Sequence, residues 1–130
     1  MSTTILVVDD SATTRSLVAS YLSDGGDCEV LEAGSGFEAL KILPARRVDL
    51  IVTDINMPDI NGLELISFVR ANANYRRIPV VIITTENSAE DRKRGLDLGA
   101  SDYLVKPFAA ADLRRAVSGA LGRGQEGEGR

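Results

Sequence analysis

Short apolar segments alternate with longer amphipathic segments along almost the whole chain. Five of the short segments are rich in Val and Ile, and several contain an unbroken apolar run, as strands covered on both faces of a parallel sheet must. They span residues 4–8, 28–33, 49–54, 78–85 and 101–106. The pattern therefore predicts a five-stranded parallel sheet.

Between these segments, apolar residues recur at spacings of three and four, which predicts helices that each place one face on the sheet. The stripes consist of Leu17, Val18, Tyr21 and Leu22, of Leu40 and Leu43, of Leu65, Ile66 and Val69, and of Leu113, Val117, Ala120 and Leu121. A further helix is predicted at about residues 88–98, with Ser88 as its N-cap and Gly99 just past its end. Strands alternating with five helices predict an α/β fold, doubly wound, with helices on both faces of the sheet.

The pattern ends near residue 121. A chain of 130 residues is long enough for one domain that folds without disulfides or metal. Residues 122–130 contain no hydrophobic residue and many glycines, so they cannot offset the entropy of ordering themselves. We therefore predict a domain over residues 1–121 and a disordered tail over residues 122–130, with no second domain, so that the surface of the first must carry the function.

Composition excludes some classes of function. A formal net charge of −4 disfavours binding to nucleic acid, and the absence of histidine removes the commonest general base. The single cysteine, Cys28, cannot form an internal disulfide and is interpreted as a small core residue in a reducing compartment. The chain begins without a basic signal-peptide segment, and its first apolar run is too short to span a bilayer. We expect a cytoplasmic protein, monomeric by default, with no membrane partner.

Polar side chains follow the predicted strands at the points where these strands end. Asp9 and Asp10 follow the first strand, Asp54 ends the third, Thr84 lies near the end of the fourth, and Lys106 ends the fifth. Ligands of open α/β sheets bind beyond the carboxyl ends of the strands. The sequence therefore predicts that three carboxylates, a hydroxyl and an ammonium group converge on one edge of the sheet.

Each of these residues also has a simpler explanation when it is taken alone. Asp10 or Ser11 could cap the first helix, and Asp54 could form an Asx turn. Thr84 could be an ordinary strand residue, and Lys106 a solvated surface charge. Their shared position at the ends of different strands favours a common site.

Four motifs, VVDD, TDINMPDINGLEL, VIITTEN and LVKPF, occur in this order on the predicted strands. In this combination the chain resembles the receiver domain of bacterial two-component response regulators, from about residue 4 to residue 121. The resemblance implies a flavodoxin-like sheet with strand order 2-1-3-4-5. It also implies phosphoryl transfer to Asp54 from a phosphohistidine on a histidine kinase or phosphotransfer protein. Such a protein is no enzyme toward other molecules and catalyses only its own phosphorylation and dephosphorylation.

The predicted cluster of acids suggests a bound cation. Carboxylates a few ångströms apart repel one another by about 4 kcal/mol per close pair at an effective dielectric constant of about 20. A divalent cation together with Lys106 would neutralise Asp9, Asp10 and Asp54, and oxygen ligands of this kind suit Mg²⁺. The resemblance implies that Asp10, Asp54 and the backbone carbonyl of Asn56 bind the metal directly, while Asp9 acts through a metal-bound water.

The resemblance also assigns roles around the acceptor. Lys106 and Thr84 would each contact an oxygen of the phosphoryl group on Asp54. Movement of Thr84 toward that group would make room for the ring of Tyr103, so Tyr103 is a candidate switch residue. The alternative for Tyr103 is a half-buried strand residue with its hydroxyl in water.

Asn56 and Glu86 occupy the positions that, in the family, govern attack of water on the acyl phosphate. Their identities resemble those of the chemotaxis regulator, and we predict a phosphoryl group with a short lifetime.

The docking face implied by the resemblance comprises the fourth helix, the fifth strand and the fifth helix. A basic patch around a tyrosine would suit an acidic helix or peptide of a downstream target protein, although a solvated helix face is the simpler explanation for each residue. The candidate exposed groups are Arg92, Lys93, Tyr103, Arg114 and Arg115.

Three other classes of protein remain as alternatives. An aspartate-nucleophile phosphatase would carry a second acid where this chain has Asn56. A flavodoxin-like cofactor binder would need a phosphate-cradling loop where Asp9 and Asp10 stand. A receiver-fold interaction module that never accepts phosphate is the main competitor.

Overall fold

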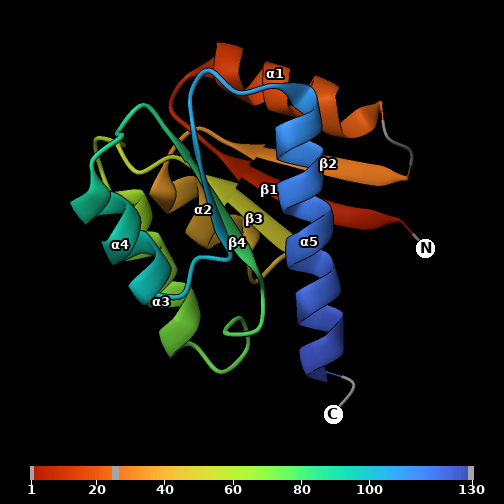
Figure 1. The fold of residues 1–130 in the computed structure, drawn as a ribbon. Helices are drawn as coiled ribbons and strands as arrows, with labels where there is room; N and C mark the ends of the chain where they lie inside the picture. Colours follow the sequence, from red (N-terminus) through yellow and green to blue (C-terminus); the bar gives the residue numbers. More distant parts are fainter. Residues whose placement is uncertain (1, 25–26, 129–130) are drawn as a thin grey trace.

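The computed structural model describes residues 2–24 and 27–128, with side chains to residue 122, and contains a five-stranded parallel sheet in the order β2-β1-β3-β4-β5 (Figure 1). The strands are β1 (Thr3–Val8), β2 (Cys28–Ala33), β3 (Leu50–Thr53), β4 (Val80–Thr84) and β5 (Asp102–Val105). The helices are α1 (Ala12–Ser23), α2 (Gly36–Ile42), α3 (Gly62–Ala71), α4 (Ala89–Asp97) and α5 (Ala110–Glu128). The predicted α/β class, the five strands and the implied strand order are confirmed.

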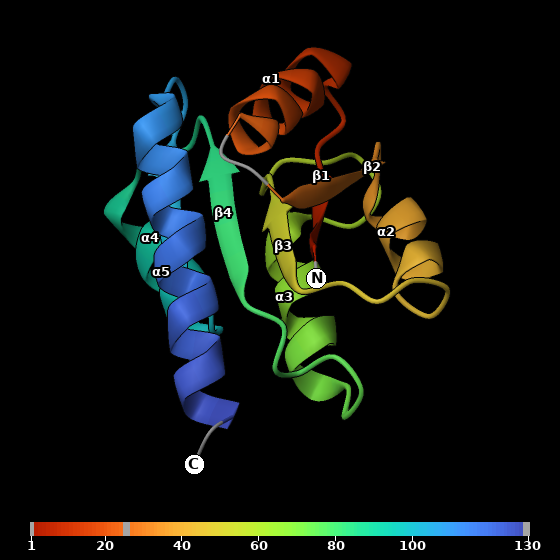
Figure 2. The same ribbon diagram turned by 90° about the vertical axis from the view of Figure 1, so that its right-hand side faces the viewer.

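Helices cover both faces of the sheet. Helices α1 and α5 pack on one face, and α2, α3 and α4 pack on the other (Figures 1 and 2). Strand β1 divides its side chains between the two layers, with Ile5 and Val7 on the α1 and α5 side and Leu6 and Val8 on the opposite side. Every residue of β3 and β4 is buried, which explains why these segments are apolar without alternation.

Two predictions about the core need correction. Leu17 was predicted to face the sheet, but 44% of its surface is exposed. Val18 and Leu22 are the buried residues of α1, and a helix places only one narrow stripe against a sheet, so Leu17 falls on the flank of that stripe. Cys28 lies on the edge strand β2 and is only partly buried, against the core on the α1 and α5 side.

The ends of the helices follow the predicted capping residues. Ser88 is the N-cap of α4, where its hydroxyl accepts the Asp91 N–H at 3.1 Å, and Gly99 has a φ of +109° just beyond the C-cap. Ser11 is the N-cap of α1 and accepts the Thr14 N–H at 3.2 Å. The helix therefore does not use Asp10 as its cap, which leaves that carboxylate available.

Helix α5 extends beyond the predicted end of the domain. Its backbone is helical to Glu128, whereas residues 122–130, of which 129 and 130 lie outside the described residues, were predicted to form a disordered tail. Within the described part of the chain, a Cβ atom at Gly122 would meet no neighbour within 4 Å, so no tertiary packing supports this position. Among the described residues no helix, α5 included, combines the length and apolar character needed to cross a bilayer.

Gly62 is the glycine on which the loop after β3 depends. A Cβ atom at this position would overlap the carbonyl oxygen of Asp54 and lie 2.9 Å from its carbonyl carbon. We expect Gly62→Ala to lower the free energy of unfolding by about 1–3 kcal/mol, because backbone atoms must shift to admit the methyl group. Urea denaturation measures this change. Gly122→Ala is the control, since the same methyl group meets no neighbour there; equal stability of the two variants would contradict the prediction.

Candidate metal centre at the carboxyl edge of the sheet

The register of the parallel strands brings the polar residues to one level. Val8 of β1 lies beside Thr53 of β3, so Asp9 and Asp54 leave the sheet next to each other. On the other side, Thr84 of β4 lies beside Val105 of β5, and Lys106 follows directly. The predicted convergence of these residues at the carboxyl edge is thus a consequence of strand pairing.

Three carboxylates form a compact cluster at this edge. One oxygen from each of Asp9, Asp10 and Asp54 lies within 4.8 Å of the others. Asp9 is fully buried and Asp54 is 7% exposed, whereas Asp10 is exposed. Water therefore solvates the cluster mainly from the side of Asp10.

Lys106 binds two members of the cluster. Its Nζ donates to Asp9 Oδ2 at 2.8 Å and to Asp54 Oδ2 at 3.1 Å, and the side chain is 18% exposed. The alternative of a solvated surface lysine is therefore wrong. Burial lowers the pKa of Lys106, but the hydrogen bonds and charges of Asp9 and Asp54 outweigh this effect, and the pKa is raised above its ordinary value.

The remaining oxygens of the two buried acids accept backbone hydrogen bonds. Asp9 Oδ1 accepts the Ser11 N–H at 2.8 Å, and Asp54 Oδ1 accepts the Asn56 N–H at 3.3 Å. The Asx turn considered for Asp54 is therefore present, and it coexists with the contact to Lys106 rather than replacing it. Both carboxylates are held in place from two directions.

The donor set fits a divalent cation. The three carboxylates and Lys106 together carry a net charge of −2, and every available side-chain donor in the cluster is a carboxylate oxygen. Small hard cations such as Mg²⁺ prefer such ligands, while the absence of sulfur and imidazole disfavours zinc and copper. The cluster could therefore bind a metal.

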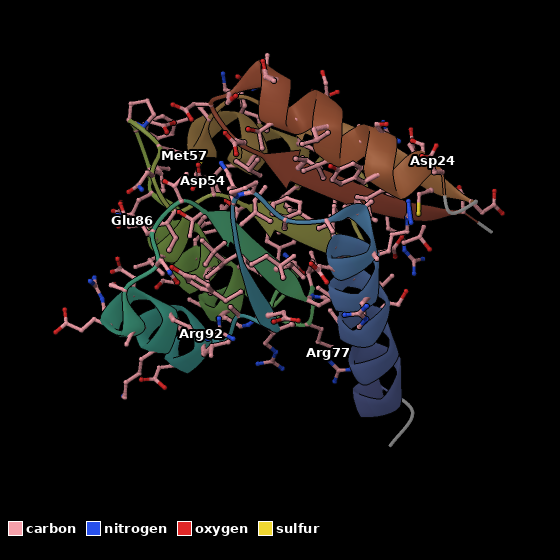
Figure 3. The ribbon with its side chains drawn as sticks, turned by 45° about the horizontal axis from the view of Figure 1, so that its top comes forward. Asp24, Asp54, Met57, Arg77, Glu86 and Arg92 are labelled. Atoms are coloured by element: carbon pink, nitrogen blue, oxygen red, sulfur yellow. The ribbon has the colours of Figure 1, made fainter. Side chains whose placement is uncertain are left out.

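The loops after β3 and β4 are joined beside the cluster. Glu86 Oε1 accepts from Asn56 Nδ2 at 3.0 Å, and the Glu86 N–H donates to the Thr84 hydroxyl oxygen at 3.2 Å. Asp54 and Glu86 lie on the same side of the molecule, far from Asp24 at the end of α1 (Figure 3). These hydrogen bonds connect Asn56, two residues after Asp54, with the buried Thr84 of β4.

Tyr103 is buried, and its hydroxyl is bonded to the protein rather than to water. Only 3% of the residue is exposed, and its hydroxyl donates to the backbone carbonyl of Glu86 at 2.8 Å, so the alternative of a hydroxyl in water is wrong. Its place among the exposed groups of the docking face is wrong for the same reason. The guanidinium of Arg92 lies 5.6 Å from the ring centroid. Burial, followed by the charges of Asp91 and Glu86, raises the pKa of Tyr103.

The other candidates for the docking face divide into two groups. Arg92, Lys93 and Arg115 are exposed, as expected. Arg114 is partly buried, and its Nε donates to the backbone carbonyl of Tyr21 on α1 at 3.0 Å. Because this contact belongs to the α1–α5 interface, the inclusion of Arg114 in the docking face is wrong.

Arg15 is a residue of the site that the sequence did not reveal. Its Nη1 donates to the backbone carbonyl of Asp9 at 2.6 Å, and its Nε donates to Glu32 of β2 at 3.2 Å. The available signal was its position one turn after the N-cap Ser11, on the same side of the helix. Spacing alone does not show that the guanidinium turns back toward the strand ends.

A groove at the opposite end of the sheet carries no comparable chemistry. It has a volume of about 620 Å³ and is lined by Thr3, Arg46, Asp49, Arg77 and Pro79, among other residues. It adjoins the amino ends of the strands, and Arg77 lies far from Asp54 in Figure 3. The single carboxylate of its lining, on Asp49, accepts the Thr4 N–H at 2.8 Å. The candidate site is therefore identified by its clustered carboxylates and lysine, and not by the volume of a cavity.

The sequence of this chain also matches a known family. The sequence model of the response regulator receiver domain matches residues 5–118, which includes every strand end described above. The chain belongs to the receiver domain family.

Relatives of this receiver domain come from chemotaxis. It is 40% identical over 126 residues to a chemotaxis protein CheY homolog of Campylobacter jejuni, which covers 96% of each chain. It is 40% identical over 119 residues to chemotaxis protein CheY1 of Helicobacter pylori, covering 91% of this chain and 96% of that one. The crystal structure of Vibrio cholerae CheY4 superposes with a TM-score of 0.83 at 36% identity, covering 91% and 98% of the two chains. This is a response regulator receiver domain of the CheY type.

Lys106 should stabilise the receiver domain and compete with a cation. We expect Lys106→Met to lower the free energy of unfolding in EDTA by about 1–3 kcal/mol, less than for a fully buried pair because the side chain is partly exposed. We also expect it to bind Mg²⁺ more tightly, because the ammonium no longer neutralises Asp9 and Asp54. Denaturation and calorimetric titration measure these effects. Lys93→Met, which removes an exposed pair with Asp97, is the charge-matched control; identical behaviour of both variants would refute the prediction.

Proposed function

We propose that this receiver domain accepts a phosphoryl group on Asp54 from a phosphohistidine of a histidine kinase or phosphotransfer protein, with Mg²⁺ bound at the carboxylate cluster. The observation that carries the proposal is the Lys106 ammonium group bound to both Asp9 and Asp54 inside a cluster of three carboxylates. The carboxylates would bind a divalent cation, and the cation together with Lys106 would attract the oxygens of a phosphoryl group.

In the proposed reaction, an oxygen of Asp54 forms a bond to phosphorus while the bond between phosphorus and the histidine nitrogen breaks. The leaving imidazole keeps the electron pair and takes a proton from solvent. Lys106 would stabilise the negative charge of the phosphoryl oxygens. Thr84 would donate its O–H to another oxygen, since its hydroxyl oxygen accepts from Glu86 and its own proton stays available.

The metal would be held by Asp10, Asp54 and the backbone carbonyl of Asn56, with Asp9 acting through water. When bound, Mg²⁺ supplies positive charge that reduces the repulsion between the phosphoryl oxygens and the carboxylates. The oxygen donors of the cluster and its net negative charge support this assignment.

The phosphorylated receiver domain would signal by binding a downstream target protein. The relatives in Campylobacter jejuni and Helicobacter pylori are chemotaxis proteins, which supports signalling of this kind. We expect the receiver domain to act in the cytoplasm as a monomer. Arg92, Lys93 and Arg115 remain exposed on α4 and α5, and they would suit an acidic segment of the target.

Asp54→Asn tests the acceptor directly. Wild-type protein incubated with Mg²⁺ and acetyl phosphate should gain the mass of one phosphoryl group, and Asp54→Asn should gain none, because the amide is a poor nucleophile. Mass spectrometry of the intact protein measures the gain. Asp59→Asn is the matched control, since Asp59 is an exposed acid of the same loop that bonds to the N–H groups of Gly36 and Phe37. Labelling of Asp54→Asn would reject the acceptor assignment.

The same experiment separates the proposal from its main competitor. A receiver-fold interaction module that never accepts phosphate would show no gain of mass in wild-type protein. An aspartate-nucleophile phosphatase is disfavoured, because Asn56 stands where its second acid is expected and the amide bonds to Glu86.

Asn56 and Glu86 should control the lifetime of the phosphoryl group. The Asn56 N–H donates to Asp54 at 3.3 Å, and the Asn56 side chain donates to Glu86 at 3.0 Å, so both side chains would lie where water approaches the acyl phosphate. We expect a short-lived acyl phosphate and a lifetime changed several-fold by joint substitution of both residues with alanine, as measured by decay of the phosphorylated mass. Joint substitution of Asn87 and Glu90, which are exposed in the following segment, is the control. An unchanged lifetime in the Asn56 and Glu86 variant would refute the assignment.

Tyr103 should report phosphorylation. The ring is buried with its hydroxyl on the Glu86 carbonyl, and the N–H of the same Glu86 contacts Thr84, so a shift of Thr84 toward the phosphoryl group would change the environment of the ring. We expect NMR signals of the Tyr103 ring to shift when acetyl phosphate and Mg²⁺ are added. Tyr75, which packs against Phe68, is the internal control. Ring signals of Tyr103 that stay unchanged on phosphorylation would exclude the switch.

A further inference from the structure

We propose that Arg15 is a positioning residue of the metal centre, and that it fixes the peptide between Asp9 and Asp10 so that the Asp10 carboxylate points into the cluster. The inference rests on the proposed function, because it concerns the Mg²⁺ site assigned there.

Arg15 reaches the site from the first turns of α1. Its Nη1 donates to the Asp9 carbonyl at 2.6 Å, while its Nε donates to Glu32 of β2 at 3.2 Å. The side chain is only 18% exposed. A Cβ atom at Gly34 would lie 3.3 Å from Nη1, so the turn after β2 passes close to the guanidinium. Arg15 is therefore held between α1, β2 and this turn, and its fork-shaped donor group has a fixed direction.

Asp10 is the member of the cluster that needs this support. The Asp9 side chain is fixed by Ser11 and Lys106, at 2.8 Å each. By contrast, within residues 2–24 and 27–128, no hydrogen bond or ion pair holds the carboxylate of the exposed Asp10. Its direction therefore depends on the backbone that carries it.

The Asp9 carbonyl belongs to the peptide that leads into Asp10. A hydrogen bond to this oxygen fixes the rotation of the peptide plane, and the plane sets the direction in which the Asp10 Cβ leaves the chain. Arg15 thus acts on Asp10 through one peptide unit without contacting its carboxylate. Glu32 holds the other side of the guanidinium and keeps it aimed at this carbonyl.

Charge and position predict opposite effects on Mg²⁺ binding. A guanidinium beside an acidic cluster repels a cation, so loss of its charge alone would tighten binding. Loss of a group that orients a metal ligand weakens binding, commonly by about 10–100-fold. Whether the Mg²⁺ affinity falls or rises therefore separates a positioning role from an electrostatic one. A role in stability alone would leave the affinity unchanged.

The test is calorimetric titration of MgCl₂ into the wild type, Arg15→Met and Arg15→Lys. We expect Arg15→Met to bind Mg²⁺ about tenfold more weakly. Arg15→Lys should recover part of the affinity, because an ammonium group can still donate to the Asp9 carbonyl but cannot hold this carbonyl and Glu32 together with a planar fork. Arg46→Met is the matched control, with affinity equal to wild type. Arg46 forms an analogous pair with Glu29 of β2 at 2.7 Å, at the other end of the strand.

Affinity of Arg15→Met equal to or tighter than that of wild type would overturn the inference while the Mg²⁺ site stands. Failure of the wild type to bind Mg²⁺ would overturn the proposed function and the inference with it. If Arg15→Met does not fold, Arg15→Lys provides the decision, since it keeps the positive charge and loses the planar fork. Mg²⁺ binding by Arg15→Lys that is weaker than that of wild type would support the positioning role, and binding equal to wild type would overturn it.

Discussion

The candidate site depends on three carboxylates that the fold holds close together, at one edge of the sheet, against their mutual repulsion. Strand pairing fixes Asp9 next to Asp54, and Asp10 cannot move far from Asp9. Lys106 offsets part of this repulsion by binding two of the acids, and a net charge of −2 remains. The cluster thus costs stability in isolation and would gain it on binding the proposed divalent cation, which would tie the fold of this edge to the proposed chemistry.

One chain of hydrogen bonds connects this edge with the buried tyrosine. Asn56 lies in the loop after β3, where its N–H bonds to Asp54 and its side chain bonds to Glu86. The backbone of Glu86 bonds in turn to Thr84 and to Tyr103. A change at Asp54 can therefore reach the tyrosine through three short contacts, without a large rearrangement of the sheet. The exposed Arg92, over the tyrosine ring, lies at the outer end of the same chain.

The sequence predicted the elements better than the directions of single side chains. The strands were predictable because β3 and β4 are buried on both faces, and the cluster because parallel strands end at one edge. Arg114 and Tyr103 were misplaced, because periodicity cannot tell that one guanidinium reaches across to α1 and that one hydroxyl finds a carbonyl. Arg70 escaped prediction for the same reason: its guanidinium, with a pKa lowered by burial, donates to the carbonyls of Ile78 and Gly99.

The central claim is that the carboxylate cluster is a divalent cation site. The most direct measurement is the free energy of unfolding of the wild-type protein, determined by urea denaturation over a series of free Mg²⁺ concentrations. If folded protein alone binds the cation, stability should rise with the logarithm of Mg²⁺ concentration above the dissociation constant, by about 1.4 kcal/mol per tenfold increase. Stability that does not change over the whole series would contradict the account.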